Sequence, residues 1–258
     1  MKLCASINFL FAHLPPEERP AAAAAAGFDG VEIQDFSIAE PFALAKATQA
    51  ASVKVVLLNA PLGDLFAGGP GLSGAPHREA AFDEALAATL EAARALKPLY
   101  VNVGAFRMDA AAGADWTATY ERNIWKASRA LKEVGATPLL EPMNSLDIPG
   151  VTPGDFAFAA QLVRETFRGA VGLQFDTYHA ARRGEAIAET VEAYADLIMH
   201  VQVSDYPGRG EPGSGDLDFS SFFARLRSLG YDGYVGAEYK PTGATADSLS
   251  WLALAGGR

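Results

Sequence analysis

Short apolar runs alternate with longer amphipathic stretches along most of the chain. The run from Val53 to Asn59 is rich in β-branched and aliphatic residues, and its length is typical of a buried strand. The same pattern predicts eight strands, over residues 2–8, 31–34, 53–59, 100–103, 137–141, 171–176, 198–202 and 234–238.

The stretches between these strands carry helical periodicity. Ile124, Ala127 and Leu131 recur at spacings of three and four, which predicts a helix with one apolar face. Comparable patterns, bounded by proline at the start or glycine at the end, predict the other helices. The predicted helices cover residues 15–26, 39–51, 77–96, 115–134, 152–166, 185–195, 219–229 and 245–255.

Eight strand-then-helix units in 258 residues define the expected fold class. Regular alternation of strand and helix implies a parallel sheet. Eight such units at about 250 residues have the size of a closed (β/α)₈ TIM barrel. We therefore predict an α/β fold with one barrel domain over residues 1–258. An open doubly wound sheet is the alternative, but the segment Asn8 to Ala12 is not the glycine-rich turn expected after its first strand.

One long segment, residues 60–76, is rich in glycine and proline and carries no periodic pattern. Loops of this length inside a compact domain are uncommon, and they are usually functional or disordered. We interpret the segment as a candidate lid over the site, with a disordered loop as the alternative.

Composition limits the class of partner. Half of the residues are hydrophobic and the net charge is −10, so the chain can bury a sizeable core but would repel a phosphate backbone. Nucleic acid is therefore not an expected partner. No apolar run approaches the roughly 20 residues that span a bilayer, so we expect no membrane partner either. A small anionic substrate remains compatible, and the sequence leaves a homo-oligomer open.

Cys4 is the only cysteine, which excludes an intrachain disulfide and a cysteine-rich zinc site. The segment from Met1 to Asn8 lacks the charged and apolar regions of a signal peptide. Together these features favour a reducing, cytoplasmic location.

Four consecutive predicted strands end on side chains that carry oxygen: Glu141, Asp176, Gln202 and Glu238. In a parallel barrel the active site lies at the carboxyl ends of the strands, so these side chains are expected to converge. Three carboxylates in one recess repel one another unless a cation lies between them. An all-oxygen donor set favours Mg²⁺ or Mn²⁺. The alternative is that these acids cap helices or lie in solvent.

A divalent cation at this position suggests a particular chemistry. It would polarise the carbonyl of a hydroxy-carbonyl compound and acidify the adjacent C–H group. Glu141 and Glu238 stand at the two ends of the arc, so they are the candidate acid/base pair for proton transfer through an enediolate. Asp176 and Gln202 are then expected to act as metal ligands only.

Two histidines lie near these strand ends. His179, three residues beyond Asp176, is a candidate to hydrogen-bond a substrate oxygen or to add a metal ligand. His200 lies two residues before Gln202 on the same face of its strand. It is a candidate substrate-binding residue, and it is equally a candidate packed core residue that supports the ligands.

Three further residues are candidate substrate contacts. Lys240 and Arg209 are cations that can pair with a substrate carboxylate, a role that suits a bidentate guanidinium well. Arg209 can equally form a salt bridge with Glu211. Asn59, at the end of the third predicted strand, is a candidate for the wall of the substrate site.

Several motifs around these residues resemble the hydroxypyruvate isomerase family within the xylose isomerase-like barrels. The resemblance extends over nearly the whole chain. Its main strings are Leu140-Glu141-Pro142-Met143-Asn144, Asp147-Ile148-Pro149-Gly150, Gln174-Phe175-Asp176-Thr177-Tyr178-His179, His200-Val201-Gln202-Val203-Ser204-Asp205, Pro207-Gly208-Arg209-Gly210-Glu211-Pro212-Gly213 and Glu238-Tyr239-Lys240-Pro241.

This resemblance implies a divalent metal held by Glu141, Asp176, Gln202 and Glu238, with the two glutamates moving protons. It also implies an isomerase acting on hydroxypyruvate and tartronate semialdehyde, or on a slightly longer 2-oxo acid such as a 2-oxo-tetronate. Gln202 at the third position resembles this family more than the ketohexose epimerases, which usually place a histidine there. A ketose 3-epimerase with the same metal site is the alternative, and a nuclease related to AP endonucleases is a third hypothesis that the acidic charge disfavours.

Overall fold

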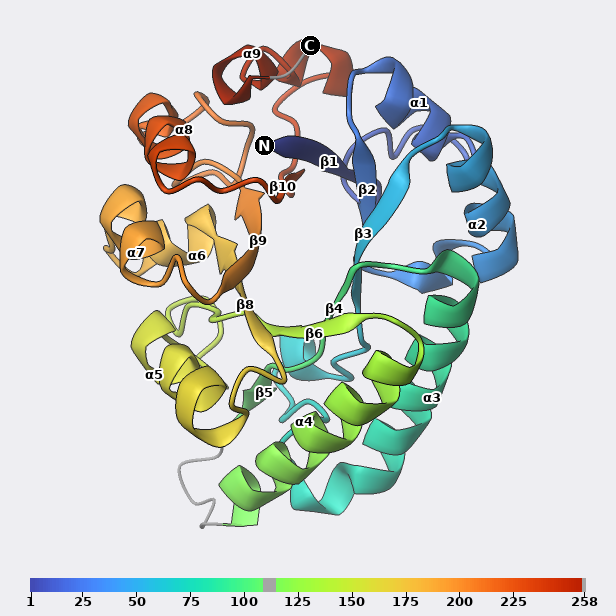
Figure 1. Ribbon diagram of the computed structural model, residues 1–258, viewed down its shortest axis with the longest axis vertical. Coiled ribbons are helices and arrows are strands. Elements are labelled where there is room, and N and C mark those ends of the chain that lie inside the picture. Colours follow the sequence, from blue (N-terminus) through green and yellow to red (C-terminus); the bar gives the residue numbers. More distant parts are fainter. Residues whose placement is uncertain (109–114, 257–258) are drawn as a thin grey trace.

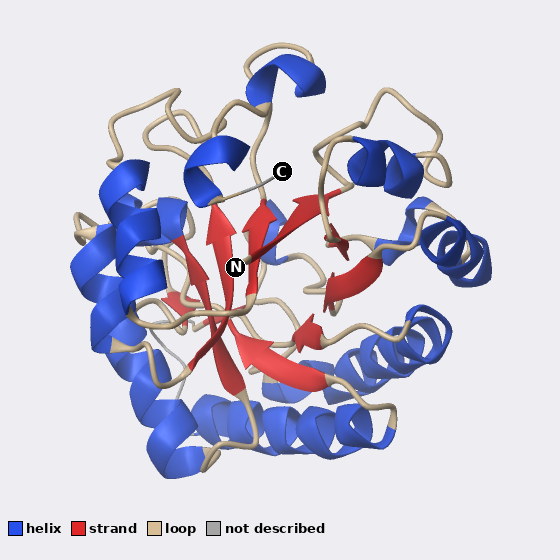
Figure 2. Cartoon of the chain, turned by 45° about the horizontal axis from the view of Figure 1, so that its top comes forward, coloured by secondary structure: helices blue, strands red, loops and turns tan. Residues whose placement is uncertain are grey.

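The computed structural model describes residues 1–108 and 115–256. Within these residues, eight parallel strands close into a barrel in the order β1-β10-β9-β8-β6-β4-β3-β2, and helices surround it (Figures 1 and 2). Each barrel strand therefore lies beside the barrel strands that come before and after it in the chain. The predicted TIM barrel is confirmed, and the open-sheet alternative is wrong.

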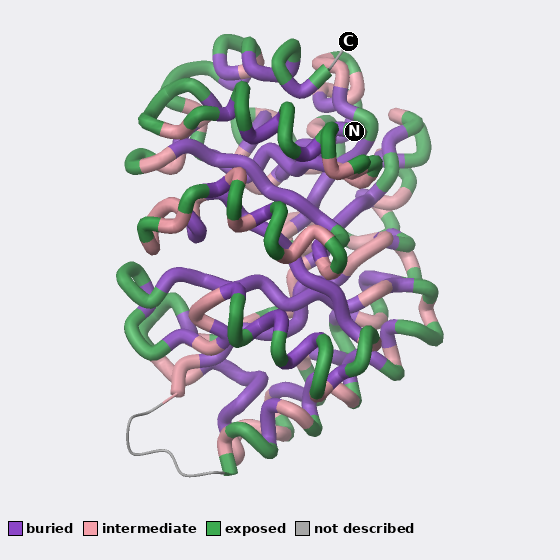
Figure 3. Tube along the Cα trace, turned by 60° about the vertical axis from the view of Figure 1, so that its left-hand side comes forward, coloured by how far each residue is buried: buried purple, intermediate pink, exposed green. Residues whose placement is uncertain are grey.

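The barrel strands match the predicted apolar runs closely. Most residues of each run are buried because one face lies in the barrel and the other faces the helices, and Figure 3 shows the centre of the molecule as mainly buried chain. The strands are β1 (Lys2–Ser6), β2 (Gly30–Ile33), β3 (Lys54–Asn59), β4 (Tyr100–Asn102), β6 (Thr137–Leu140), β8 (Gly172–Asp176), β9 (Ile198–Val203) and β10 (Tyr234–Ala237).

The helices bury one face against these strands. In α4 the predicted apolar residues Ile124, Ala127 and Leu131 are fully buried. No described helix combines the length and the apolar character that a bilayer crossing requires. The helices are α1 (Arg19–Ala25), α2 (Pro41–Ala50), α3 (Glu79–Leu96), α4 (Asp115–Glu133), α5 (Phe156–Gln161), α6 (Thr177–Arg182), α7 (Ile187–Ala193), α8 (Phe219–Ser228) and α9 (Leu252–Ala255).

The structure differs from the predicted elements in several places, one of which is the short helix α6, which was not predicted. A short antiparallel pair, β5 (Phe106–Arg107) with β7 (Val151–Thr152), was not predicted. The predicted helix 152–166 begins only at Phe156, because residues 151–152 belong to β7, and its last turns are π-helical over Leu162–Thr166. The predicted helix 245–255 is instead a 3₁₀ turn, Thr245–Ser248, followed by the short α9.

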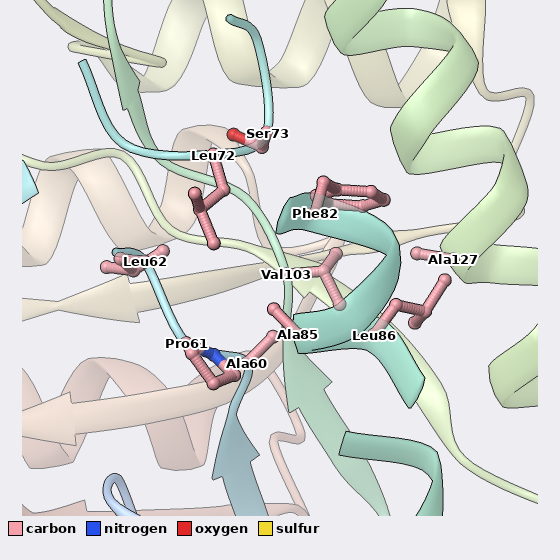
Figure 4. A pocket seen from close by; sticks show the side chains of 10 residues that line it. All are labelled: Ala60, Pro61, Leu62, Leu72, Ser73, Phe82, Ala85, Leu86, Val103 and Ala127. Carbon is pink, nitrogen blue, oxygen red and sulfur yellow. The ribbon is translucent and has the colours of Figure 1, made fainter. Parts of the chain in front are cut away.

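The segment 60–76 is folded onto the barrel, so the alternative of a disordered loop is wrong. Its Leu65 and Ala75 are buried, and a 3₁₀ turn covers Leu65–Ala67. Leu72 of this segment lines a small apolar pocket with Phe82 and Leu86 of α3 (Figure 4). These contacts hold the second half of the segment on the barrel, while its first half, residues 60–63, 65 and 66, lines the barrel mouth.

Arg107 of β5 links this segment to the loop after β6. Its Nη1 donates to the carbonyl of Pro149 at 2.7 Å, and its Nη2 donates to the carbonyl of Leu65 at 3.4 Å. The two walls of the barrel mouth are thus joined by one guanidinium group.

Candidate active site

Three carboxylates converge at the carboxyl ends of the barrel strands. Glu141 follows β6, Asp176 ends β8 and Glu238 follows β10, and their relative exposures are 5%, 1% and 8%. Glu141 and Glu238 line a cavity of about 780 Å³ at the barrel mouth. Asp176 is not among the residues that line this cavity, and the strand register places it directly beside Gln202 of β9.

The Arg209 guanidinium lies between two of these carboxylates. Its Nη2 is 3.3 Å from Oε2 of Glu238 and 3.4 Å from Oδ2 of Asp176. Burial opposes the charge of Arg209, but the carboxylates of Glu238, Asp176 and Glu141 raise its pKa above the ordinary value. The same guanidinium stacks over the ring of Tyr178, 5.0 Å from its centroid. A cation therefore already occupies part of the space among the acids.

The positive charge of Arg209 does not fully offset the burial and mutual repulsion of the three carboxyl groups. Burial, and then the charge of Asp176, raises the pKa of Glu141 to about 8, against the opposing effects of Arg209 and Asn102. Burial also raises the pKa of Glu238 well above its ordinary value. In the metal-free protein these carboxyl groups hold protons at a pH where ordinary glutamates are ionised. Such perturbed carboxyl groups in one cavity are typical of an active site.

A buried aspartate holds the loop that carries Arg209. Asp205 accepts hydrogen bonds from the backbone N–H groups of Tyr206, Gly213, Gly215 and Leu217, at 2.8–3.1 Å. The backbone N–H of Arg209 also donates to the Asp205 carbonyl at 2.8 Å. The loop is therefore folded around one carboxylate, and the position of Arg209 depends on it.

Asp176 has two functions. Its Oδ1 accepts from the backbone N–H groups of Tyr178 and His179 and so caps α6, while its Oδ2 faces Arg209. The helix-capping alternative considered for these acids therefore applies to Asp176, but only to one of its oxygens. The second oxygen remains directed at the site.

The imidazole of His179 has a defined tautomer. Its Nδ1 accepts from the backbone N–H of Asn144 at 3.3 Å, so Nε2 carries the hydrogen. That Nε2 lies 3.8 Å from Oε1 of Glu141 at the cavity wall. Burial lowers the pKa of His179 to about 4, which keeps the ring neutral. His179 is therefore arranged as a neutral hydrogen-bond donor rather than as a metal ligand.

Asparagine side chains complete the upper part of the site. Asn102, at the end of β4, donates from Nδ2 to Oε2 of Glu141 at 2.6 Å. Asn59, at the end of β3, lines the cavity, and its buried Oδ1 has no partner within the described residues. An unpaired acceptor at this position can receive a hydrogen bond from a substrate hydroxyl group.

Gln202 lies just below the carboxylates. Its Nε2 donates to Glu32 at 2.8 Å, and its Oε1 accepts from Nε2 of Gln174 at 2.5 Å. A carbonyl oxygen has two lone pairs, so Oε1 can still bind a cation. Gln202 is thus compatible with the predicted role as a ligand.

Two other candidates lie elsewhere. His200 is fully buried inside the barrel, with Nε2 2.5 Å from Oε1 of Glu32, and so belongs to the layer beneath the mouth. Lys240 is exposed, and its backbone N–H donates to the carbonyl of Arg209. Neither side chain contributes to the lining of the cavity.

The donor set fits a divalent cation. One ligand atom each from Glu141, Asp176 and His179 lie within 4.8 Å of one another, and all three residues are buried. Because His179 directs a hydrogen atom at this point, the carboxylates and the Gln202 oxygen are the better donors. Hard oxygen donors favour Mg²⁺ or Mn²⁺, and a cation would oppose the mutual repulsion and burial that raise the pKa values of Glu141 and Glu238.

Several of these residues were not predicted from the sequence. Asn102 ends β4 in the structure, but the predicted strand ran on to Val103, so the rule that selected the four strand-end residues passed over it. Asn144 and Asp205 lie in quoted motifs but had no assigned role. Glu32 gave no signal, because its contacts depend on closure of the barrel.

Comparisons with known proteins show the family to which the chain belongs. Residues 20–255 match the family model of the xylose isomerase-like TIM barrel. The chain belongs to this family of barrel proteins. It is 32% identical to hydroxypyruvate isomerase of Escherichia coli, over 98% of each chain, and 32% identical to 2-oxo-tetronate isomerase of Cupriavidus necator, over 97% of each chain. The chain is thus an isomerase related to hydroxypyruvate isomerase.

Solved structures show the same fold. A Brucella melitensis protein described as an AP endonuclease of family 2 is 31% identical, with a TM-score of 0.90 over 98% of each chain. A 3-keto-D-glucoside 4-epimerase from E. coli is 22% identical, with a TM-score of 0.79 over 98% of this chain and 99% of the other. At that identity the second comparison supports the fold alone.

Proposed function

We propose that the chain is a divalent-metal-dependent isomerase that interconverts hydroxypyruvate and tartronate semialdehyde, or a closely related pair such as the isomers of a 2-oxo-tetronate. The observation that carries this proposal is the group of three buried carboxylates at the barrel mouth: Asp176 lies close to Glu141, and Arg209 bridges Asp176 and Glu238. The relationship to the E. coli and C. necator isomerases supports the same substrate class.

Glu141, Asp176, Gln202 and Glu238 would hold the metal. When bound, Mg²⁺ or Mn²⁺ would polarise the substrate carbonyl and neutralise negative charge that develops on its oxygens. Arg209 contacts Glu238 and Asp176, so its guanidinium would share these two carboxylates with the metal.

Proton transfer is assigned to the two glutamates. One removes a proton from the hydroxymethyl carbon of hydroxypyruvate, and the C–H electron pair forms the double bond of an enediolate. The other delivers a proton to the former carbonyl carbon. The proton of the hydroxyl group on the first carbon passes to the former carbonyl oxygen, so that the first carbon becomes the aldehyde and the second carries the hydroxyl group. Carboxyl groups with raised pKa values are suited to both steps near neutral pH.

Neighbouring polar groups would bind the substrate. The Nε2–H of His179 is directed at the site and can donate to a substrate oxygen. Arg209 can form a charge-assisted pair with the substrate carboxylate. Asn59 Oδ1 can accept from a substrate hydroxyl group.

The size of the cavity favours a second candidate. About 780 Å³ is more than a three-carbon acid fills, so a four-carbon acid or a ketose could also enter. In a ketose 3-epimerase the same glutamates would return the proton to the opposite face of the same carbon. The net charge of −10 makes a nuclease a poorer candidate.

The test is a substrate panel followed by NMR in D₂O with Mg²⁺ or Mn²⁺. Tartronate semialdehyde, a 2-oxo-tetronate and several ketoses are incubated separately with the protein. Conversion of an acid to its isomer supports the proposal. Inversion at the third carbon of a ketose, without turnover of the acids, supports the epimerase instead. Turnover that is unaffected by EDTA contradicts the metal requirement.

A further inference from the structure

Glu32 is a fully buried carboxylate in the barrel interior, below the carboxylates of the site. Its Oε2 accepts hydrogen bonds from Nε2 of Gln34 at 2.7 Å and from Nε2 of Gln202 at 2.8 Å. Its Oε1 accepts from Sγ of Cys4 at 3.4 Å and lies 2.5 Å from Nε2 of His200. Side chains from β1, β9 and the end of β2 therefore meet at one carboxylate.

A glycine makes this reach across the barrel possible. In the closed sheet, β10 and β1 separate β9 from β2. Gly236 of β10 lies in register between Cys4 of β1 and Gln202 of β9. A Cβ atom at position 236 would overlap Oε1 of Glu32. The missing side chain thus provides the space through which Glu32 contacts Gln202.

The cluster of Cys4, Glu32 and His200 has the residue types of a metal site, and its ligand atoms lie within 4.8 Å. The packing opposes that role. The 2.5 Å contact between Glu32 and His200 leaves no room for an ion between them, and both side chains are fully buried. Glu32 is better described as an acceptor shared by four donors.

We infer that Glu32 is a positioning residue that orients the oxygen of Gln202 toward the proposed metal site. An amide group has one donor end and one acceptor end. Because Glu32 accepts from the Nε2 of Gln202, the amide cannot rotate without placing its oxygen against a carboxylate. The Nε2 of Gln174 reinforces this orientation of the amide because it donates to Oε1 of Gln202 at 2.5 Å. This inference rests on the proposed function only in assigning Gln202 as a ligand.

The same contact also tunes the ligand. A hydrogen bond from an amide N–H to a carboxylate increases the negative charge on the amide oxygen, which strengthens its interaction with a cation. Substitution of such supporting residues typically weakens metal affinity by about 10–100-fold. Glu32→Gln keeps the size of the side chain but replaces one acceptor oxygen with an NH₂ group, which cannot accept from Gln34 or Gln202. This variant therefore tests the hydrogen bond to Gln202.

The first measurement uses the metal-free protein. The side-chain NH₂ resonances of Gln202 are identified by their loss in Gln202→Ala, and are then followed in Glu32→Gln and Cys4→Ala. Cys4→Ala is the matched control, because it removes a donor to Oε1 of Glu32 and leaves Oε2 with Gln202. We expect a clear shift in Glu32→Gln and little change in Cys4→Ala. Unshifted resonances in folded Glu32→Gln overturn the inference.

The second measurement is the affinity for Mn²⁺, by titration calorimetry, in a double-mutant cycle. We expect Glu32→Gln and Gln202→Ala each to weaken binding at least tenfold, and the double variant to bind like Gln202→Ala alone. Cys4→Ala should stay within about threefold of the wild type. If the two effects multiply in the double variant, Glu32 does not act through Gln202 and the inference fails.

A folding defect would not leave the question open. Thermal unfolding checks each variant, and Glu32→Asp replaces Glu32→Gln if the latter does not fold. Glu32→Asp withdraws the carboxylate from Gln202 while keeping its charge, so weakened Mn²⁺ binding is again expected, and wild-type affinity again overturns the inference. A wild-type protein that binds no Mn²⁺ contradicts the proposed function instead, while the metal-free resonances still test the contact.

Discussion

Asn102 donates a 2.6 Å hydrogen bond from its Nδ2 to Oε2 of Glu141, and both side chains are buried. The other carboxylate oxygen, Oε1, lies 3.8 Å from Nε2 of His179. One oxygen of the proposed catalytic glutamate is therefore fixed by an amide, and the other faces the cavity. This pairing sets both the direction and the proton affinity of Glu141.

Removal of that hydrogen bond should raise the pKa of Glu141 further. In Asn102→Ala the charged form of Glu141 loses a donor, so a higher pH is needed to ionise it. We expect the acidic limb of the pH profile of kcat/KM to move to higher pH and kcat to fall by about tenfold. The profile is measured with the acid that the wild type isomerises. An unmoved acidic limb would show that Asn102 does not tune Glu141.

Substitution of either proton-transfer group should remove most of the activity. Glu141→Gln and Glu238→Gln keep the side-chain size but cannot exchange protons, so kcat should fall by about 10²–10⁴-fold. Deuterium incorporation from D₂O into the substrate should fall in parallel. Glu189→Gln, an exposed glutamate on α7, is the matched control and should behave as the wild type. Folded variants with near-normal turnover would exclude these residues as the acid/base pair.

Metal binding should depend steeply on pH. The pKa of Glu141 is about 8 in the metal-free fold, against 4.5 for an ordinary glutamate, and that of Glu238 is also raised. Across this range the native state holds more protons than the unfolded state, so the free energy of unfolding of the metal-free protein falls as pH rises.

A bound cation replaces those protons. Mn²⁺ affinity should therefore increase by up to about tenfold per pH unit for each displaced proton between about pH 5 and about pH 8. Thermal unfolding with and without Mn²⁺ checks this, and the increase in Tm should be larger at the higher pH. An equal increase at both ends of the range would contradict displacement of protons.

Arg209 should stabilise the metal-free protein more than the metal-bound one. Arg209→Gln leaves the carboxylates of Asp176 and Glu238 without their cation, and we expect a loss of about 2 kcal/mol in EDTA, because the guanidinium is partly exposed. Mn²⁺ should recover part of this loss. Arg164→Gln, which breaks an exposed pair with Asp196, is the control and should cost less than about 1 kcal/mol in either condition. If Arg209→Gln lowers the free energy of unfolding equally with and without Mn²⁺, Arg209 and the metal do not share the carboxylates of Asp176 and Glu238.

Asp205 should control activity through the loop that it organises. Asp205→Asn replaces one acceptor oxygen with an NH₂ group that faces backbone N–H donors. We expect the free energy of unfolding to fall by about 2–3 kcal/mol and KM for the acid to rise, because Arg209 moves with the loop. Denaturant unfolding and steady-state kinetics measure the two effects. If Asp205→Asn loses stability but keeps the wild-type KM, Asp205 does not affect substrate binding through the loop.

The barrel and the positions of its carboxylates were predictable because their signals are local. An apolar run that ends on Glu141, Asp176 or Glu238 can be read within six residues. The carboxyl ends of parallel strands then meet for reasons of topology alone. Helix α6, directly after Asp176, was missed because its six residues are too few to show a periodic pattern. The only local sign of it is Asp176 itself, a residue type that often caps the start of a helix.

Contacts that require closure of the barrel were not predictable in this way. Glu32 and Gln202 are separated by 170 positions, and the space for their hydrogen bond depends on Gly236 of a third strand. The β5–β7 pair has two residues in each strand, which is below the length at which alternation can be recognised. Both features depend on distant partners rather than on local pattern.

The link through Arg107 has a practical consequence for redesign. Because its guanidinium binds the carbonyls of Leu65 and Pro149, the loops at residues 60–76 and 141–150 form a matched pair. A chimera that takes only one of these loops from a relative with another substrate preference would remove one of the two carbonyl acceptors of Arg107. Grafts intended to change which molecules are accepted should therefore transfer both loops together with residue 107.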